Sequence, residues 1–392
     1  MKYLFCPLAS HGFVYPLIGL AEAARLQGHE VSFVTDSAFA ETLHKVGIPR
    51  IPCGTKDLAG FEVKNWTKPL AVAIQVKYIQ HALERFPADA LVTTQLTLGP
   101  LIAGEITGLP VVVLGLAAYL WPLWPSDHEP ESPIEKEAQW RYGDMMTHYN
   151  NARRALGLSI SDADHLANPM LGDLFLLQSV PELEQSKYAF PSKVCFVGSC
   201  LWEPETSDPE LSAWLEQGAS AAEPIVYVQQ GRSFALPGFW AKLCEALRDK
   251  AIRVVADVGR MDEEVGNIPE NFFIREHAHQ CKVLPYSSAV ISTAHTTSVL
   301  GALTHGLPCL FFPAGSGSND IAEHCERAGA ALRFYATAAD ARLIESSVHE
   351  LLSNFELREG AQRLKLAFER AGGCDRAAQL IEQAIASRCS IT

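Results

Sequence analysis

The chain has 392 residues, of which 48% are hydrophobic and 20% are charged. This composition supplies enough apolar side chains for two cores and excludes a disordered chain, and at roughly 150 residues per domain the length favours two or three domains. Lys and Arg number 32 against 45 Asp and Glu, a formal net charge of −13. Because nucleic acids and anionic membranes are bound by basic surfaces, we expect neither as a partner.

The ten cysteines show no C-x-x-C and no paired spacing. In a chain of this length that is typical of reduced thiols in a cytoplasmic protein. The apolar N-terminal run is broken by Ser10 and His11, so we expect no signal peptide. The most apolar stretch, residues 109–125, contains three prolines and is too short for a membrane span. We therefore expect a cytoplasmic protein without a membrane span.

The first half of the chain alternates predicted strands and helices. Apolar runs predict strands over residues 3–7, 31–35, 90–93 and 111–114, and helical spacing predicts helices from Leu17 to the stop at Gly28 and over 100–107. We interpret Ser10-His11-Gly12 as a loop. The strand–helix–strand unit in the first 35 residues implies a parallel sheet covered by helices.

The same alternation restarts in the second half. Strands are predicted over 225–228, 253–258, 289–292 and 309–312, and helices over 239–250 and 298–305. The segment between the halves is rich in Glu, Pro, Ser and Asp, as linkers are. We predict two doubly wound, Rossmann-like α/β domains over 1–198 and 223–372, a linker over 199–222, and a closing helix in 373–392. Such folds bind ligands beyond the carboxyl ends of their strands, so two facing domains would share a central cleft.

Residues 119–165 interrupt the alternation with aromatic side chains among acids and prolines, including Trp121, Trp124 and Tyr142. Two interpretations remain open. The aromatic residues either pack a helical insertion or form an acceptor pocket at the rim of the cleft.

His11 follows the first predicted strand and precedes the first predicted helix. A histidine at that edge of the sheet points to general base chemistry, because imidazole exchanges a proton near neutral pH. The alternative is a capping contact with other polar groups of the loop.

A second polar segment follows the predicted strand over 289–292 and consists of Thr293, Ala294, His295, Thr296, Thr297 and Ser298. A helix that begins there offers backbone N–H groups, hydroxyls and the positive end of its dipole, which suit a diphosphate. The alternative is ordinary N-capping. The loop after the strand over 225–228 contains Arg232 and Ser233, which would reach the same diphosphate unless the arginine is simply solvated. No dinucleotide glycine motif, P-loop or metal-ligand spacing is present in the sequence.

Together these motifs resemble the GT-B nucleotide-sugar glycosyltransferases of the natural-product and UDP-glucuronosyl type, the family 1-like enzymes. The resemblance covers nearly the whole chain. It rests on three blocks in the correct order: His11-Gly12-x-x-x-Pro16-Leu17 with Gly28-His29-Glu30-Val31; Trp214-Leu215 with Pro224-Ile225-Val226-Tyr227-Val228-x-x-Gly231; and Ala302-Leu303-x-x-Gly306-Leu307-Pro308-x-Leu310-x-x-Pro313 with Ala328-Gly329.

The resemblance implies an inverting, metal-independent transfer from a UDP- or TDP-sugar to a hydroxyl of a small apolar or aromatic acceptor, with no cofactor besides the nucleotide sugar. His11 matches the base that takes the acceptor proton. Gln280 matches a nucleoside-binding position, and Gly317 and Ser318 match the donor-sugar region. A homodimer or a partner enzyme is compatible with this interpretation.

The sequence departs from the family pattern mainly at the donor. Thr293 replaces the usual diphosphate-binding histidine, Gly301 replaces a glutamate, and Gly317-Ser318 replaces an Asp-Gln pair. In the first half, Thr94 stands near the acid that orients the histidine, where it would border the acceptor. Two further hypotheses therefore stay open: a catalytically silent relative that binds a partner enzyme or ligand, and a different nucleotide-linked reaction such as sugar epimerisation.

Overall fold

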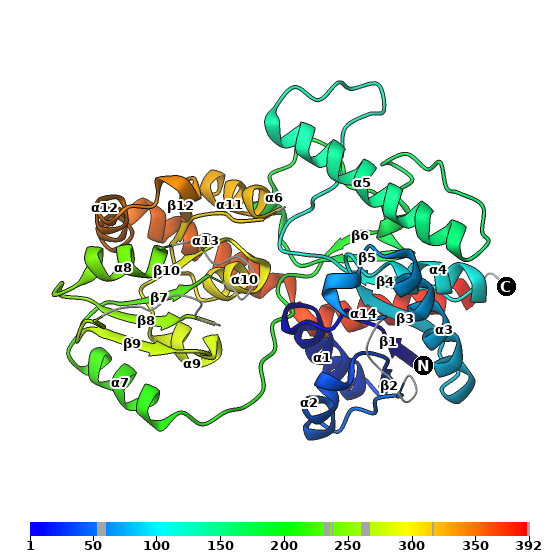
Figure 1. Ribbon diagram of the computed structural model, residues 1–392, viewed down its shortest axis with the longest axis horizontal. Coiled ribbons are helices and arrows are strands. Elements are labelled where there is room, and N and C mark those ends of the chain that lie inside the picture. The colour runs from blue at the N-terminus through cyan, green and yellow to red at the C-terminus, as the bar shows by residue number, and fades with distance from the viewer. Residues whose placement is uncertain (53–59, 231–235, 237, 260–266, 316, 390–392) are drawn as a thin grey trace. The chain divides into compact units, whose positions relative to one another are not determined.

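The computed structural model describes residues 1–52, 60–230, 236, 238–259, 267–315 and 317–389. It divides the chain into two compact units, each built on a six-stranded sheet in which all neighbouring strands are parallel (Figure 1). The first unit comprises Met1–Ser179, Ser186–Trp202 and Ala371–Thr392, and the second comprises Val180–Gln185 and Glu203–Arg370. The predicted α/β class with two doubly wound parallel sheets is confirmed.

The sheet of the first unit has the strand order β2-β1-β3-β4-β5-β6. Its strands are β1 (Lys2–Phe5), β2 (Glu30–Phe33), β3 (Ala90–Thr94), β4 (Val111–Leu114), β5 (Leu174–Leu177) and β6 (Val194–Phe196). The helices are α1 (His11–Leu26), α2 (Ala40–Lys45), α3 (Pro69–Arg85), α4 (Leu98–Thr107), α5 (Pro133–Ala155) and α14 (Gly373–Cys389), with 3-10 turns at Ser37–Phe39, Val63–Asn65 and Pro169–Leu171.

Helices cover both faces of this first sheet, because its central strands are apolar on both sides. Every residue of β3 and β4 is buried. One face packs against α3, α4 and α5 through residues such as Val76, Ile102 and Met145. The other packs against α1 and α14 through residues such as Leu17 and Ile381. The C-terminal helix therefore completes the core of the unit that contains the N-terminus.

The sheet of the second unit has the order β12-β11-β10-β7-β8-β9. Its strands are β7 (Ile225–Gln229), β8 (Arg253–Asp257), β9 (Phe272–Arg275), β10 (Ala289–Ser292), β11 (Cys309–Phe311) and β12 (Ala331–Arg333). The helices are α6 (Pro181–Glu184), α7 (Pro209–Ser220), α8 (Phe239–Leu247), α9 (Gln280–Val283), α10 (Thr296–Thr304), α11 (Ser318–Arg327), α12 (Ala341–Ser353) and α13 (Phe355–Ala371), with 3-10 turns at Leu284–Tyr286 and Ala336–Ala338.

The segment predicted as a linker, 199–222, contains the 12-residue helix α7. Asp208 caps this helix by accepting a hydrogen bond from the Leu211 N–H at 3.0 Å, and Pro209 occupies its first turn. These residues are strong helix-start signals. Leu211 and Leu215 bury their side chains, so the polar residues that suggest a linker are the solvent-facing side of a packed helix.

Helix α1 begins at His11, six residues earlier than the spacing from Leu17 predicts. Ser10 has extended backbone angles and precedes the first helical residue. The buried apolar positions extend back to Val14, whereas His11 and Gly12 are exposed, so the first residues of the helix carry no apolar spacing from which their conformation could be predicted.

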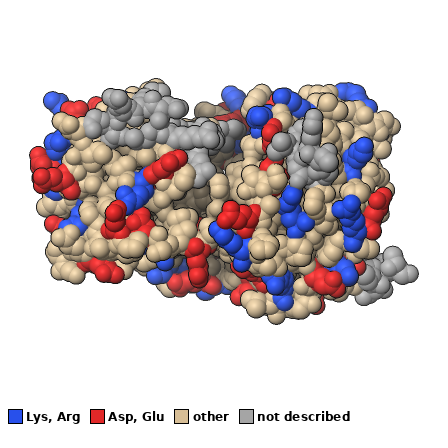
Figure 2. Space-filling view, turned by 60° about the horizontal axis from the view of Figure 1, so that its bottom comes forward, with Lys and Arg blue, Asp and Glu red and all other residues tan. Residues whose placement is uncertain are grey.

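Charged side chains of both signs are interspersed on the face shown in Figure 2, where no large field of one sign gathers. Among the described residues, no helix combines the length and the apolar character that crossing a bilayer requires. In the described part of the chain, the cysteines that form no disulfide are Cys6, Cys195, Cys200, Cys244, Cys281, Cys309, Cys325 and Cys374.

Candidate functional site

Each sheet has one point at which the strand order reverses, and parallel α/β sheets bind ligands beyond the carboxyl ends of the strands at that point. In the first unit β2 lies on one side of β1 and β3 on the other. In the second unit β8 lies on one side of β7 and β10 on the other. The loops after β1 and β3, and those after β7 and β10, are therefore the places where function is expected.

His11 lies at the reversal point of the first sheet, at the start of α1, which follows β1. Its imidazole contacts Tyr15 edge-on with ring centroids 4.8 Å apart, and Phe39 with centroids 5.3 Å apart. The residue is exposed. Two aromatic walls thus orient an accessible imidazole, an arrangement suited to general base chemistry.

Thr94 ends β3, the neighbouring strand at the same reversal point. Its side chain is 4% exposed, and its hydroxyl lies 3.1 Å from that of Thr97. The hydroxyl is engaged within its own loop, so we leave Thr94 out of the proposed acceptor site.

In the second unit, the loop after β10 leads into α10 with His295 as the N-cap residue. Ser298 Oγ lies 2.9 Å from the carbonyl oxygen of His295 and 3.0 Å from Ser292 Oγ. Ser292 Oγ in turn accepts a hydrogen bond from the Ala294 N–H at 3.1 Å. This network fixes the loop, in which Ala294 has a positive φ of 58°.

The side chain of His295 makes no capping bond to a backbone N–H of α10, although its Nδ1 lies 3.3 Å from Ser298 Oγ in the first turn. The N–H groups of a first helical turn have no partner within the helix, and the helix dipole is positive there. Thr296 and Thr297 are partly exposed at this end. The start of α10 therefore presents backbone donors that suit an anionic ligand.

Burial lowers the pKa of His295 to about 4, although part of the residue remains accessible to solvent. Its imidazole is therefore uncharged near neutral pH. Any attraction of this loop for an anion consequently comes from backbone N–H groups and the helix dipole rather than from an imidazolium.

Thr293 is 1% exposed, and its hydroxyl donates to the carbonyl oxygen of Gln230 at 2.6 Å. This bond joins the loop after β10 to the end of β7, so Thr293 supports the loop and we leave it out of the proposed ligand contacts. Arg232 and Ser233, which the sequence places in the loop after β7, lie outside the described residues.

Gln280 opens α9 and is 5% exposed, and its Oε1 has no hydrogen-bond partner in the described part of the chain. A Cβ on Gly301 would lie 2.6 Å from this oxygen and 2.8 Å from Leu284 Cδ1. The carboxamide thus occupies the space that a side chain at position 301 would need. In this chain, Gln280 and Leu284 therefore fill the position that a larger side chain at 301 would occupy.

Gly317 precedes α11 with a positive φ of 83°, and Ser318 is its first residue. The Ser318 hydroxyl donates to the carbonyl oxygen of Ala314 at 3.0 Å, and the side chain is 5% exposed. Since β11 neighbours β10, this loop leaves the same edge of the sheet as the loop before α10.

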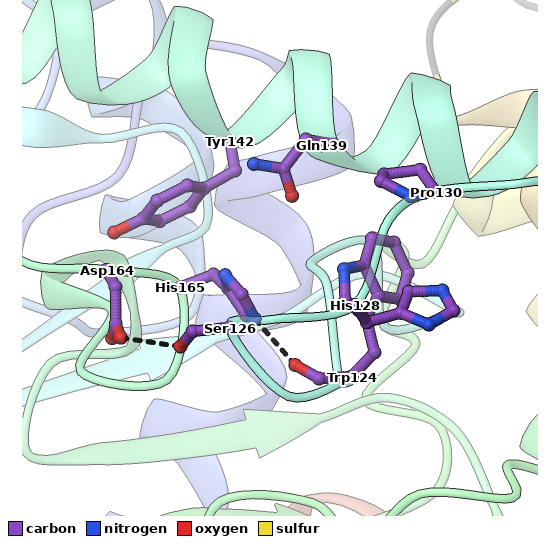
Figure 3. A pocket seen from close by; sticks show the side chains of 8 residues that line it. All are labelled: Trp124, Ser126, His128, Pro130, Gln139, Tyr142, Asp164 and His165. Carbon is purple, nitrogen blue, oxygen red and sulfur yellow. Dashed lines mark hydrogen bonds between the residues drawn. The ribbon is translucent and has the colours of Figure 1, made fainter.

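The connection between β4 and β5 contains a cavity of about 300 Å³, shown in Figure 3. Trp124 and Tyr142, two of the predicted acceptor-pocket residues, line it together with Ser126, His128, Pro130, Gln139, Asp164 and His165. Trp121 does not line it: its side chain is 3% exposed and belongs to the core beside α3 and α4. The segment is therefore a packed insertion that also lines an aromatic cavity.

Sequence reasoning missed six of the residues that line this cavity. They lie in the same insertion as Trp124, but Ser126 and Asp164, whose side chains are 3.0 Å apart, are separated by 38 residues. No periodic pattern relates them. Among the described residues, no group of three or more His, Cys, Asp or Glu side chains is arranged to hold a metal ion.

No protein-family model matches the chain. The chain is 26% identical to 4'-demethylrebeccamycin synthase of Lentzea aerocolonigenes, over 97% of this chain and 99% of that protein. It is 22% identical to NDP-glycosyltransferase YjiC of Bacillus subtilis (strain 168), over 96% of this chain and 95% of that protein. The structure of glycosyltransferase VinC in complex with DTDP aligns with a TM-score of 0.72 at 16% identity, covering 99% of this chain and all of that one.

These similarities extend over essentially the whole chain. The two parallel six-stranded sheets match those of GT-B glycosyltransferase structures, and the homologues of this chain are natural-product glycosyltransferases. The resemblance inferred from the sequence motifs is therefore confirmed.

Proposed function

We propose that the protein is an inverting glycosyltransferase that moves a sugar from a nucleoside-diphosphate donor to a hydroxyl of a small aromatic acceptor. The observation that carries this proposal is which groups lie at the two points where the sheets reverse their strand order. The first unit presents the exposed His11 there, and the second presents the start of α10. A proton acceptor and an anion-binding helix end are what such a transfer needs.

In the proposed reaction, the imidazole of His11 takes the proton from the acceptor hydroxyl. The hydroxyl oxygen forms a bond to the anomeric carbon of the sugar as the bond from that carbon to the diphosphate oxygen breaks. The electron pair leaves with the nucleoside diphosphate. Attack on the face opposite the leaving group inverts the anomeric configuration.

The second unit would hold the donor. In this proposal, the backbone N–H groups of Thr297 and Ser298 in the first turn of α10 bind the diphosphate and stabilise the charge that develops on it. Gln280, with its unpaired and buried Oε1, binds the nucleoside. Gly317 and Ser318 border the sugar. Since the helix end stabilises the leaving group, the reaction proceeds without a metal.

The first unit would hold the acceptor. Trp124 and Tyr142 line a cavity whose size is at the lower end of the range for small-molecule sites. Their rings offer broad apolar surfaces that stack well against a planar molecule. This cavity is the part of the first unit that we assign to acceptor binding.

Calorimetric titration with UDP-, TDP- and GDP-sugars tests the proposal. We expect at least one to bind, and we expect turnover with an accepting phenol to give the inverted anomer by NMR and to persist in EDTA. A retained configuration would exclude the inverting mechanism, and loss of turnover in EDTA would exclude metal independence. If no nucleotide sugar bound, the interpretation as a catalytically silent relative would replace the proposal.

A further inference from the structure

Three buried side chains form the floor of the cavity in the segment that connects β4 to β5. Trp124, Tyr142 and His165 are each 6% exposed. The Tyr142 hydroxyl donates to the carbonyl oxygen of Ala163 at 2.6 Å. In Figure 3 the ring of Tyr142 descends from α5, while Trp124 and His165 come from the loops on either side of that helix.

One polar atom of this floor is left without a partner. His165 Nε2 lies 2.7 Å from the carbonyl oxygen of Trp124. A carbonyl oxygen only accepts hydrogen bonds, so Nε2 carries a hydrogen and Nδ1 is the ring nitrogen left to accept one. No residue in the described ranges bonds to Nδ1. Figure 3 shows this second nitrogen on the side of the ring that faces Gln139 and Tyr142, into the cavity.

The rim of the cavity is acidic. Asp164 accepts hydrogen bonds from the N–H groups of Ala167 and Leu166 and from the hydroxyl of Ser126. The bond from Ala167 is the largest of the effects that hold the pKa of Asp164 below its ordinary value. A carboxylate therefore stands at the opening, and none of the eight lining residues is Lys or Arg.

These features select one class of occupant. Aromatic walls favour a planar ring, an acceptor that faces the cavity without a bond to any described residue favours a ligand that supplies a hydrogen-bond donor, and a rim carboxylate disfavours an anion. We propose that the cavity binds an uncharged planar aromatic group whose N–H or O–H donates to His165 Nδ1. This inference rests on the proposed function, because we take that group to be the aromatic part of the acceptor.

Calorimetry on the full chain without any nucleotide sugar tests this inference separately from catalysis. The probes are 2-naphthol, 2-methoxynaphthalene and 2-naphthoate near neutral pH. We expect 2-naphthol to bind at least about fivefold more tightly than its methyl ether, since one net hydrogen bond distinguishes them. We expect 2-naphthoate to bind more weakly than 2-naphthol.

Two variants locate the binding. His165→Phe removes Nδ1 and should bind both neutral probes equally. Gln139→Trp places a large ring at the exposed mouth of the cavity and should weaken 2-naphthol binding at least about tenfold. Lys136→Trp, at an exposed position of the same helix that does not line the cavity, is the matched control and should bind 2-naphthol as the wild type does.

Three results would overturn the inference: no binding of 2-naphthol, equal binding of 2-naphthol and its ether to the wild type, or unchanged binding in Gln139→Trp. If His165→Phe does not fold, the Gln139→Trp variant and the comparison of the probes on the wild type still test the inference. Nucleotide-sugar binding and turnover are measured in separate titrations. The proposed function can therefore fail while this inference holds, and this inference can fail while the proposed function holds.

Discussion

The two units present their functional groups in opposite ways. In the first, a single exposed imidazole at the start of α1 is positioned between two aromatic rings. In the second, the hydroxyls of the loop before α10 bond to neighbours in their own unit, Thr293 to Gln230 and Ser298 to the His295 carbonyl. In the function that we propose, chemistry in the first unit would thus depend on one side chain. Binding in the second would depend on backbone groups that those side chains hold in place.

The largest effect predicted from this contrast is that of His11→Ala. Removal of a general base should lower kcat about a thousandfold, while calorimetry should show nearly unchanged affinity for the nucleotide sugar. His44→Ala, an exposed histidine on α2, is the control and should retain wild-type turnover. Unchanged turnover in His11→Ala would remove this residue from the mechanism.

In the second unit, Gly301 lies against the ends of two flexible side chains. A methyl group there meets Gln280 Oε1 and Leu284 Cδ1 at distances below 3 Å, so both must shift and Gly301→Ala should lower the free energy of unfolding by about 1 kcal/mol. Truncating the neighbour relieves the clash. Urea denaturation should therefore show Gly301→Ala to cost less in a Gln280→Ala background, and strict additivity of the two changes would contradict the packing explanation.

The contrast between backbone and side-chain binding is sharpened by two substitutions at Thr297, in the first turn of α10. Thr297→Pro removes a backbone N–H in a turn that tolerates proline and should weaken nucleoside-diphosphate binding about tenfold. Thr297→Val removes only the hydroxyl and should change the affinity less than about threefold. Calorimetry measures both, with melting temperatures as the folding control. The reverse ranking would mean that the hydroxyl is the ligand.

The smallest predicted effect is a pH dependence of stability. The folded pKa of His295 is about 4 against an ordinary value of 6.5. Between these values the unfolded chain binds a proton that the folded protein does not, so the contribution is complete above pH 6.5 and is lost as the pH falls toward 4. Because the residue is partly exposed, we expect a loss of only about 1 kcal/mol.

Urea denaturation between neutral and acidic pH, compared with His295→Gln, isolates this contribution. The difference in unfolding free energy between wild type and variant should shrink as the pH falls. A difference independent of pH would show that burial does not keep this imidazole uncharged.

Two strands were predicted to the residue. The predicted bounds of β4 (Val111–Leu114) and β10 (Ala289–Ser292) equal the observed ones, because each apolar run follows a turn signal. The sequence analysis did not predict β5 (Leu174–Leu177), β9 (Phe272–Arg275), β6 (Val194–Phe196) or β12 (Ala331–Arg333), of which the last two have only three residues. Runs this short carry too little pattern to separate from loops, and only pairing with a neighbouring strand stabilises them.

The candidate site was predictable only in part, because local patterns in the sequence do not reveal contacts between distant residues. The chemical type of His11 and of the segment before Ser298 is visible in the sequence, because each directly follows a strand. The sequence does not show that the Thr293 hydroxyl bonds to the carbonyl oxygen of Gln230, 63 residues away. Nor does it show that His165 contacts the Trp124 carbonyl across 41 residues.

The sequence by itself determined the alternation of strands and helices, and with it two parallel sheets and the placement of polar residues at strand ends. These are local properties, set by hydrophobic periodicity and turn chemistry along the chain. Only the tertiary structure decided where each sheet reverses, which hydroxyls remain available to a ligand, and that the aromatic insertion encloses a cavity. Those outcomes depend on hydrogen bonds and packing between residues distant in sequence, which leave no repeating pattern in the chain.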